Sequence, residues 1–177
     1  MHRFINALGF QLGWFACIAS VKFNQEFAAL LFCGILVGVH FYFSNAPLKD
    51  FKLSLLALAL GIAIDSSLQY LTVIHFYGWA LGPLSPFWLW MVWIMFALTL
   101  NSSLSFMQNK HLLLSAVAGL IFGPLSYIAG AKLGAAALES GVLPIATLAI
   151  VWMITLPLLV FISKTLLTQI EVSHDAT

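Results

Sequence analysis

Charged side chains are scarce in this 177-residue sequence. Only 7% of the residues are Asp, Glu, Lys or Arg, and 62% are hydrophobic, whereas a soluble domain carries about 25% charged residues. A water-soluble fold of this composition would expose very large apolar patches. The composition therefore excludes a soluble globular protein and indicates a membrane protein, in which each spanning helix takes about 20 apolar residues.

Basic residues and cysteines are also few. The formal net charge is +1 and Arg3 is the only arginine, so the chain lacks the basic surface that nucleic-acid binding requires, and we expect no nucleic-acid partner. The two cysteines, Cys17 and Cys33, lie in apolar runs without CxxC spacing. We interpret them as small packing residues and not as metal ligands or a disulfide.

Sequence motifs of common membrane enzymes are missing. There is no HExxH motif, no GxSxG motif and no phosphate-binding loop. His40, His75 and His111 stand apart in the sequence, whereas a two-metal centre needs clustered imidazoles. We therefore predict no metal, no cofactor and no catalytic residue, which favours a protein that is not an enzyme but leaves an enzyme open.

Six apolar runs make up nearly the whole chain. Each is long enough to cross a bilayer, and short polar or proline-containing breaks separate them. The runs cover residues 4–21, 26–44, 53–71, 87–106, 111–132 and 142–163. The sequence predicts an all-α, polytopic membrane protein with a single domain, residues 1–177, built as one bundle of six transmembrane helices.

The distribution of Lys and Arg predicts the orientation of this bundle. With alternating spans, five cations fall on one side and two on the other. The five are Arg3, Lys49, Lys52, Lys110 and Lys164, and the two are Lys22 and Lys132. Since cations in short loops stay on the cytoplasmic side, both termini are expected in the cytoplasm. A signal peptide is an alternative for the first run, although Asn6, Gln11 and Trp14 interrupt it.

Small residues at four-residue spacing recur in the spans. Gly9 and Gly13 form such a pair in the first run, and Gly119 and Gly123 form one in the fifth, which predicts that the fifth span is the central packing helix. The pair Gly9 and Gly13 is also a candidate docking face for a membrane-protein partner. Packing inside one chain and homodimerisation are the alternatives for these pairs.

Ionisable residues at membrane depth are candidate functional groups because their burial is costly. Helix geometry places Asp65 beyond the midplane, with Gln69 one turn away on the same face. Tyr127 and Lys132 reach similar levels on the fifth span. We predict a cluster of these four residues in which Lys132 pairs with Asp65. A protonated Asp65, hydrogen-bonded to Ser66, to Ser67 or to a neighbour's carbonyl, is the alternative.

A second polar layer is predicted nearer the other membrane face. His40 and Asn101 both lie about 21 Å from the outer face at 1.5 Å per residue, and Gln11 comes close to the same level. Trp90 and Trp93 share the helix face of Asn101, so an aromatic stripe leads toward its amide. Such a wall is typical of a pocket for an apolar ligand. The alternatives are a packing histidine at His40 and interhelical hydrogen bonding by Asn101.

Three stretches resemble a bacterial family of small inner-membrane proteins of unknown function. They are NALGFQLGWFAC (residues 6–17), WLWMVWIMFALTLNSSLSFM (residues 88–107) and GPLSYIAGAKLGA (residues 123–135). The resemblance covers nearly the whole chain. It implies six spans, a bacterial inner membrane and a loose association with enzymes that modify unsaturated membrane acyl chains. It implies no catalytic residue.

These observations favour a non-catalytic accessory protein of membrane-lipid metabolism. It would bind a membrane lipid or another apolar ligand between its helices, with the polar side chains as orienting groups. A small transporter, or the substrate-capture subunit of a larger importer that docks through Gly9 and Gly13, is the second hypothesis. An intramembrane enzyme is the third.

Overall fold

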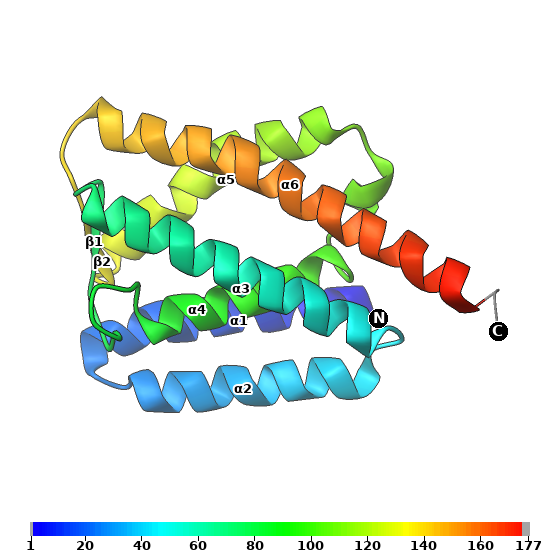
Figure 1. Cartoon of the computed structure of the whole chain (residues 1–177). Helices are drawn as coiled ribbons and strands as arrows, with labels where there is room; N and C mark the ends of the chain where they lie inside the picture. The colour runs from blue at the N-terminus through cyan, green and yellow to red at the C-terminus, as the bar shows by residue number, and fades with distance from the viewer. Residues whose placement is uncertain (1, 175–177) are drawn as a thin grey trace.

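A computed structural model describes the backbone of residues 2–174 and the side chains of residues 3–166. Within this part of the chain, six α-helices form a bundle (Figure 1). They are α1 (His2–Phe23), α2 (Glu26–Phe43), α3 (Pro47–Tyr70), α4 (Phe87–Leu100), α5 (Leu112–Lys132) and α6 (Val142–His174). Short elements complete the fold: strands β1 (Ile74–Phe76) and β2 (Ala136–Leu138), and the 3₁₀ helix η1 (Ser105–Asn109). The predicted all-α bundle of six helices is confirmed.

Five of the described helices, α1, α2, α3, α5 and α6, are long and apolar enough to cross a membrane. The fourth, α4, has only 14 residues, which is about 21 Å of helix against about 30 Å of hydrocarbon. The predicted fourth helix over residues 87–106 is therefore wrong at its C-terminal end. The chain turns after Leu100 because Asn101, Ser102 and Ser103 carry short polar side chains that compete for backbone hydrogen bonds.

The third helix begins six residues before the predicted start at residue 53. Pro47 occupies its first turn, where the missing N–H group costs nothing and the fixed φ angle suits a helix. The earlier start brings Lys49 and Asp50, which the sequence places in a loop, onto the helix. Both side chains are buried.

The central helix of the bundle is α4 and not α5. It packs against α1, α2, α3 and α6, whereas α5 packs mainly against α6. Trp88, Trp93, Met95 and Ala97 are accordingly buried along α4. The prediction of a central fifth span is wrong because Gly119 and Gly123 make room for one neighbouring helix, α6, through Trp152 and Leu156.

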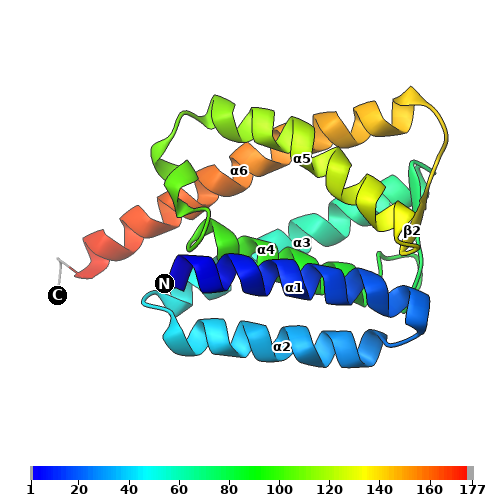
Figure 2. The same cartoon turned by 180° about the vertical axis from the view of Figure 1, so that it is seen from behind.

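Two ends of the bundle can be distinguished. At one end, here called the β-end, β1 and β2 pair antiparallel with His75 opposite Ala137, and the segment 77–86 folds over the helix ends (Figure 1). At the other end, here called the N-end, α1 begins and the connections α2–α3 and α4–α5 lie (Figure 2). The segment 72–86 is partly buried: Ser85 is fully covered, whereas Trp79 is 53% exposed.

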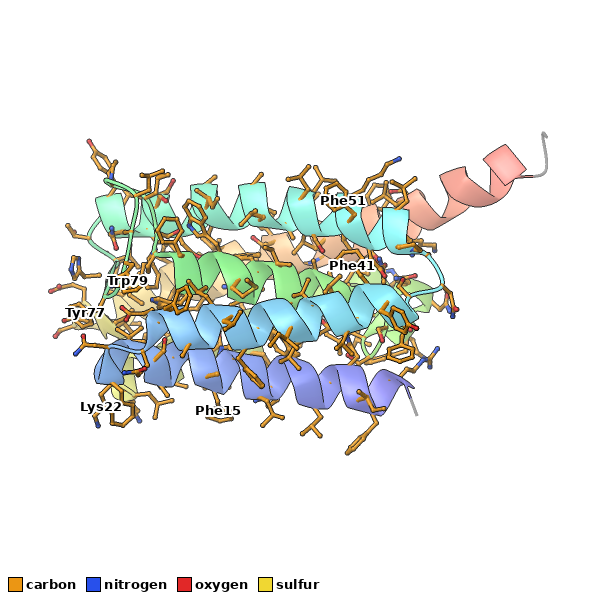
Figure 3. All side chains as sticks on the ribbon, turned by 90° about the horizontal axis from the view of Figure 1, so that it is seen from below. Phe15, Lys22, Phe41, Phe51, Tyr77 and Trp79 are labelled. Carbon is orange, nitrogen blue, oxygen red and sulfur yellow. The ribbon has the colours of Figure 1, made fainter. Side chains whose placement is uncertain are left out.

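The outer surface is apolar along the helices and rich in aromatic side chains at both ends. Figure 3 shows Tyr77 and Trp79 at the β-end and Phe51 at the opposite end. Tyr42 and Tyr70 are 82% and 87% exposed and lie at the C-terminal ends of α2 and α3. Apolar flanks between aromatic ends match the hydrocarbon and interface of a bilayer.

Candidate functional site

Asp65 is the most completely buried acid of the described chain, with no exposed surface. Its Oδ1 accepts a hydrogen bond from the Tyr127 hydroxyl of α5 at 2.5 Å, and its Oδ2 accepts one from Trp93 Nε1 of α4 at 2.6 Å. Gly61 lies one turn earlier on the same face of α3, and a Cβ atom there would overlap the Trp93 indole. The small residue lets the indole reach the carboxylate, so three helices meet at Asp65.

The predicted partner of Asp65 is wrong. Lys132 is exposed, and the described residues give Asp65 hydrogen bonds and no ion pair. Lys132 is the last residue of α5, where its long side chain can reach the interface without bending inward. Gln69 also lies apart, because its Oε1 accepts a hydrogen bond from the Phe76 backbone N–H at 3.1 Å and so holds β1 against α3.

Trp152 of α6 joins the group from a helix that carries no predicted site residue. Its ring stacks on Trp93 with a centroid distance of 5.2 Å and an interplanar angle of 9°. Gly119 and Gly123 leave the space that its backbone and ring occupy. The Trp152 ring lies edge-on to the Tyr127 ring, with a centroid distance of 6.3 Å. The Trp152 indole nitrogen is buried and has no partner within hydrogen-bond distance and angle among the described residues.

These side chains form one wall of a cavity of about 440 Å³, here called the lateral cavity. Its volume lies within the range of small-molecule binding sites. Helices α1, α4, α5 and α6 supply the sides, and β1 and β2 supply the wall at the β-end. Residues of the lining include Phe10, Gln11, Trp14, Ile74, Phe76, Trp93, Phe96, Ser126, Tyr127, Ala136 and Trp152. Asp65 lies behind this wall and holds Trp93 and Tyr127 in place by accepting a hydrogen bond from each.

The lateral cavity opens between α1 and α5. Helix α1 packs against α2 and α4, whereas α5 packs against α6 and β2. Gln11 of α1 and Phe122 and Leu125 of α5 line the cavity and are exposed. In a membrane this opening faces acyl chains and not water, because both helices are candidate spans.

A second polar group lies at the N-end around Asp50 of α3. Its carboxylate accepts hydrogen bonds from His40 Nε2 at 3.0 Å, from the Ser44 hydroxyl at 2.5 Å and from Asn101 Nδ2 at 2.7 Å. His40 and Asn101, which the sequence places at one level, do belong to one hydrogen-bond network. The acid that joins them is not among the predicted site residues.

The Asp50 network continues on both sides. Asn6 Nδ2 lies 3.2 Å from His40 Nδ1, and Asn6 Oδ1 accepts from the backbone and side chain of Ser103. His40 therefore has Asn6 beside Nδ1 and Asp50 beside Nε2. Both ring nitrogens are thus occupied. Across the network, Asn101 Oδ1 accepts from Ser163 and Gln108.

A cavity of about 470 Å³, here called the terminal cavity, adjoins this network. Its lining combines apolar side chains of α1 and α2 with His40, Lys49, Asp50 and Asn101. The polar groups predicted for one pocket are therefore divided between two. Gln11, Trp93 and Tyr127 line the lateral cavity, whereas His40 and Asn101 line the terminal cavity.

Trp90 and the candidate docking pair, Gly9 and Gly13, do not line the lateral cavity. Trp90 Nε1 donates to the Ser85 hydroxyl at 3.1 Å and lines neither cavity. Gly13 packs under Met95 and Cys33, whereas Gly9 has open space where a side chain would begin. Cys17 and Cys33 are buried free thiols whose sulfur atoms lie 3.6 Å apart.

Sequence reasoning missed Asp50 and Trp152 for different reasons. Asp50 follows Pro47 by three residues, and reading that proline as the first turn of a helix would place the acid within the bundle. No such signal marks Trp152, whose burial depends on glycines about 30 residues away on α5. Among the described residues, no group of three His, Cys, Asp or Glu side chains is arranged to hold a metal.

Tyr127→Phe is expected to lower the free energy of unfolding by about 1 to 2 kcal/mol, because it removes a buried hydrogen bond to a carboxylate and leaves one oxygen of Asp65 without its donor. Thermal unfolding in detergent, followed by size-exclusion chromatography, measures the loss. Tyr42→Phe is the matched control, since Tyr42 is 82% exposed. Equal stability of the two variants would contradict the role assigned to the Asp65 hydrogen bond.

Comparison with known proteins gives one match. A family model described as a protein of unknown function matches residues 3–158, which is nearly the whole chain and confirms the resemblance seen in the sequence. Neither a curated protein nor a solved structure matches the chain significantly.

Proposed function

The chain belongs to the family of unknown function DUF2878, and from this premise we propose that it is a lipid-binding accessory protein of a bacterial inner membrane. The lateral cavity is the observation that supports the proposal. It combines aromatic and aliphatic walls with a few polar atoms, as sites for apolar ligands do. Its opening between α1 and α5 would admit a molecule directly from the bilayer.

The chemistry of the cavity supports binding over catalysis. The Ser126 hydroxyl donates to the Gly123 carbonyl of its own helix at 2.8 Å, and no histidine belongs to the described lining. A nucleophile needs a base within hydrogen-bond reach. His40, at the other cavity, has both ring nitrogens engaged by Asn6 and Asp50. In neither cavity does a serine of the described lining donate a hydrogen bond to a histidine.

The orientation of the bundle is part of the proposal. The N-end carries Arg3, Lys49, Lys52, Lys110 and Lys164, so the positive-inside rule favours a cytoplasmic N-end and a β-end at the outer face. The lateral cavity, whose wall includes β1 and β2, would then lie in the outer half of the membrane. A ligand would enter from the acyl chains of that leaflet.

Gly130→Leu is expected to reduce lipid retained by the purified protein while the fold persists. Gly130 lines the lateral cavity, and a Cβ atom there would meet only Ile18 Cδ1 at 3.7 Å, which is ordinary contact. The added side chain would occupy the space of the ligand. Native mass spectrometry of protein released from detergent should show bound lipid in the parent protein and at least about tenfold less in the variant.

Gly38→Leu is the matched control for this experiment. Gly38 is also a helical glycine, has open space where a side chain would begin and lies outside the lining of both cavities. It should retain as much lipid as the parent protein. If Gly130→Leu folds and still carries the same lipid, the lateral cavity is not the binding site and the proposed function fails.

A further inference from the structure

Phe10 of α1 is the one described residue that lines both cavities. Asn6 and Gly9, which precede it on α1, belong to the terminal cavity. Gln11 and Trp14, which follow it, belong to the lateral cavity. The other walls of the terminal cavity come mainly from α2, α3 and α4, whereas α5 and α6 contribute only to the lateral cavity. The Phe10 side chain therefore stands between two cavities of similar volume.

Helix α4 completes the partition between the cavities. The rings of Phe10 and Phe96 are in contact, with a centroid distance of 6.0 Å. Phe96 lines the lateral cavity, and the residue before it, Met95, lines the terminal cavity. Helices α1 and α4 pack directly against each other, so the space between the two cavities is narrow. On the α1 side it is closed by a single aromatic ring.

The Phe10 ring has room to turn aside. Gly9 precedes it, lines the terminal cavity and has no atom within 4 Å of the place where a Cβ atom would begin. Phe10 itself is only half-buried. A helical phenylalanine has two favoured χ1 rotamers, so a change of rotamer is able to open the partition and join the two cavities.

The joined space would be polar at one end only. The described lining of the lateral cavity contains no Asp, Glu, Lys, Arg or His. The lining of the terminal cavity contains His40, Lys49 and Asp50, together with Ser44 and Asn45 of the α2–α3 connection. That connection lies at the N-end (Figure 2). The polar end of the joined space thus coincides with an end of the bundle, where lipid head groups meet water.

The terminal cavity has a mouth of its own. Ile5 of α1 and Val39 and Phe43 of α2 belong to its lining and are exposed. Both helices are candidate spans, so this mouth faces the acyl chains of the leaflet at the N-end. It gives that leaflet an entrance in addition to the opening between α1 and α5.

The length of the joined space suits one acyl chain. On α1 its lining runs from Ile5 to Ile18, which is about 20 Å of helix. One leaflet is about 15 Å of hydrocarbon thick, and Phe10 lies only about 8 Å along the path from Ile5. A chain that starts at the N-end is therefore long enough to pass Phe10 and to end in the lateral cavity.

We infer that Phe10 is a gate between the two cavities, and that together they hold a single-chain amphiphile, such as a lysolipid or a fatty acid. Its polar head lies among the polar groups at the N-end, and its chain passes Phe10 into the lateral cavity. The narrow space between α1 and α4 takes one chain, so a two-chain lipid would leave its second chain outside. The inference deepens the proposed function and rests on it.

Photo-cross-linking of the full-length protein in detergent micelles tests the inference. Two probes are made from hexadecanoyl lysophosphatidylcholine, with a diazirine either at the chain end or beside the ester. Helix α5 lines only the lateral cavity and α2 only the terminal cavity. Specific labelling is the part that excess unlabelled lysolipid removes. Peptide mass spectrometry should find it on α5 for the chain-end probe and on α2 for the ester-end probe.

Unlabelled competitors define the class of ligand. Hexadecanoate and the lysolipid share one chain and differ in the head, so each should displace the chain-end probe from α5. Dihexadecanoyl phosphatidylcholine has two chains and should compete at least about tenfold more weakly than the lysolipid.

Phe10→Trp should lower specific chain-end labelling of α5 by at least about fivefold, because the larger ring fills the partition. Phe10→Ala provides a second variant if Phe10→Trp does not fold. It should bind the lysolipid at least about threefold more tightly, since the open state no longer competes with a closed one. Phe15→Trp is the matched control, because Phe15 is 49% exposed on α1 and lines neither cavity. It should change neither the labelling nor the affinity.

The outcomes separate the inference from the proposed function. Specific labelling of α5 by the ester-end probe would overturn the assigned direction of the ligand. Labelling and affinity that the Phe10 variants leave unchanged would overturn the gate, and equal competition by the two-chain lipid would overturn the single-chain class. Absence of specific labelling on α5 would overturn the whole inference. The proposed function would survive each of these results if Gly130→Leu still reduced the retained lipid, and would fail with them if it did not.

Discussion

Gly119→Leu is expected to destabilise the bundle by about 3 kcal/mol or more, which should prevent recovery of folded protein from detergent. A Cβ atom at Gly119 would overlap the backbone carbonyl of Trp152, and α6 could not relieve the overlap by rotating a side chain. Extra atoms in a well-packed core cost about 1 to 3 kcal/mol even where side chains can move. The yield of monodisperse protein and its melting temperature in detergent measure the effect.

Gly34→Leu is the control for this substitution. Gly34 and Gly38 form the same GxxxG pattern on α2, yet both are exposed and have open space where a side chain would begin. Leucine there should be tolerated within about 0.5 kcal/mol. Leucine in the GxxxG pattern of α2 is thus expected to leave the stability almost unchanged, whereas leucine in the GxxxG pattern of α5 is expected to lower it strongly. Equal losses at Gly34 and Gly119 would show that the α5–α6 contact is not as close as described.

Asp50→Asn is expected to lower the free energy of unfolding by about 3 kcal/mol. His40 and Ser44 donate to one carboxylate oxygen and Asn101 donates to the other. In either orientation, the Asn amide turns an N–H₂ group toward at least one of these donors. The variant keeps the size of the side chain but leaves buried donors unsatisfied, which costs more than a hydrogen bond is worth. Chemical or thermal unfolding in micelles measures the loss.

Ser54→Ala is the matched control on the same helix. The Ser54 hydroxyl is buried one turn from Asp50 and has no hydrogen-bond partner among the described residues. Its removal should be neutral or slightly stabilising, since no donor or acceptor is stranded. If Asp50→Asn proves as mild as Ser54→Ala, the carboxylate does not hold α2, α3 and α4 together.

The two predictions depend on contacts that no short stretch of sequence contains. Asp50 and Asn101 lie 51 residues apart, and Gly119 and Trp152 lie 33 residues apart. Helix geometry predicts that His40 and Asn101 share a level, and they do share a network. It cannot predict which helices are neighbours. For this reason Lys132 is misassigned to Asp65, and Trp93 of α4, which is the neighbour of α3, supplies the bond instead.

Composition alone determined that this is a membrane protein surrounded by lipid, because thirteen charged residues among 177 cannot cover a globule in water. Runs of apolar residues determined the number of helices and most of their ends. Tertiary structure decided that α4 is central, that Trp152 lies over the glycines of α5 and that the polar residues divide between two cavities. These features follow from the shapes of facing helix surfaces. Lipid tails are as apolar as the side chains, so hydrophobicity cannot choose between helix partners, and close packing and hydrogen bonds make that choice.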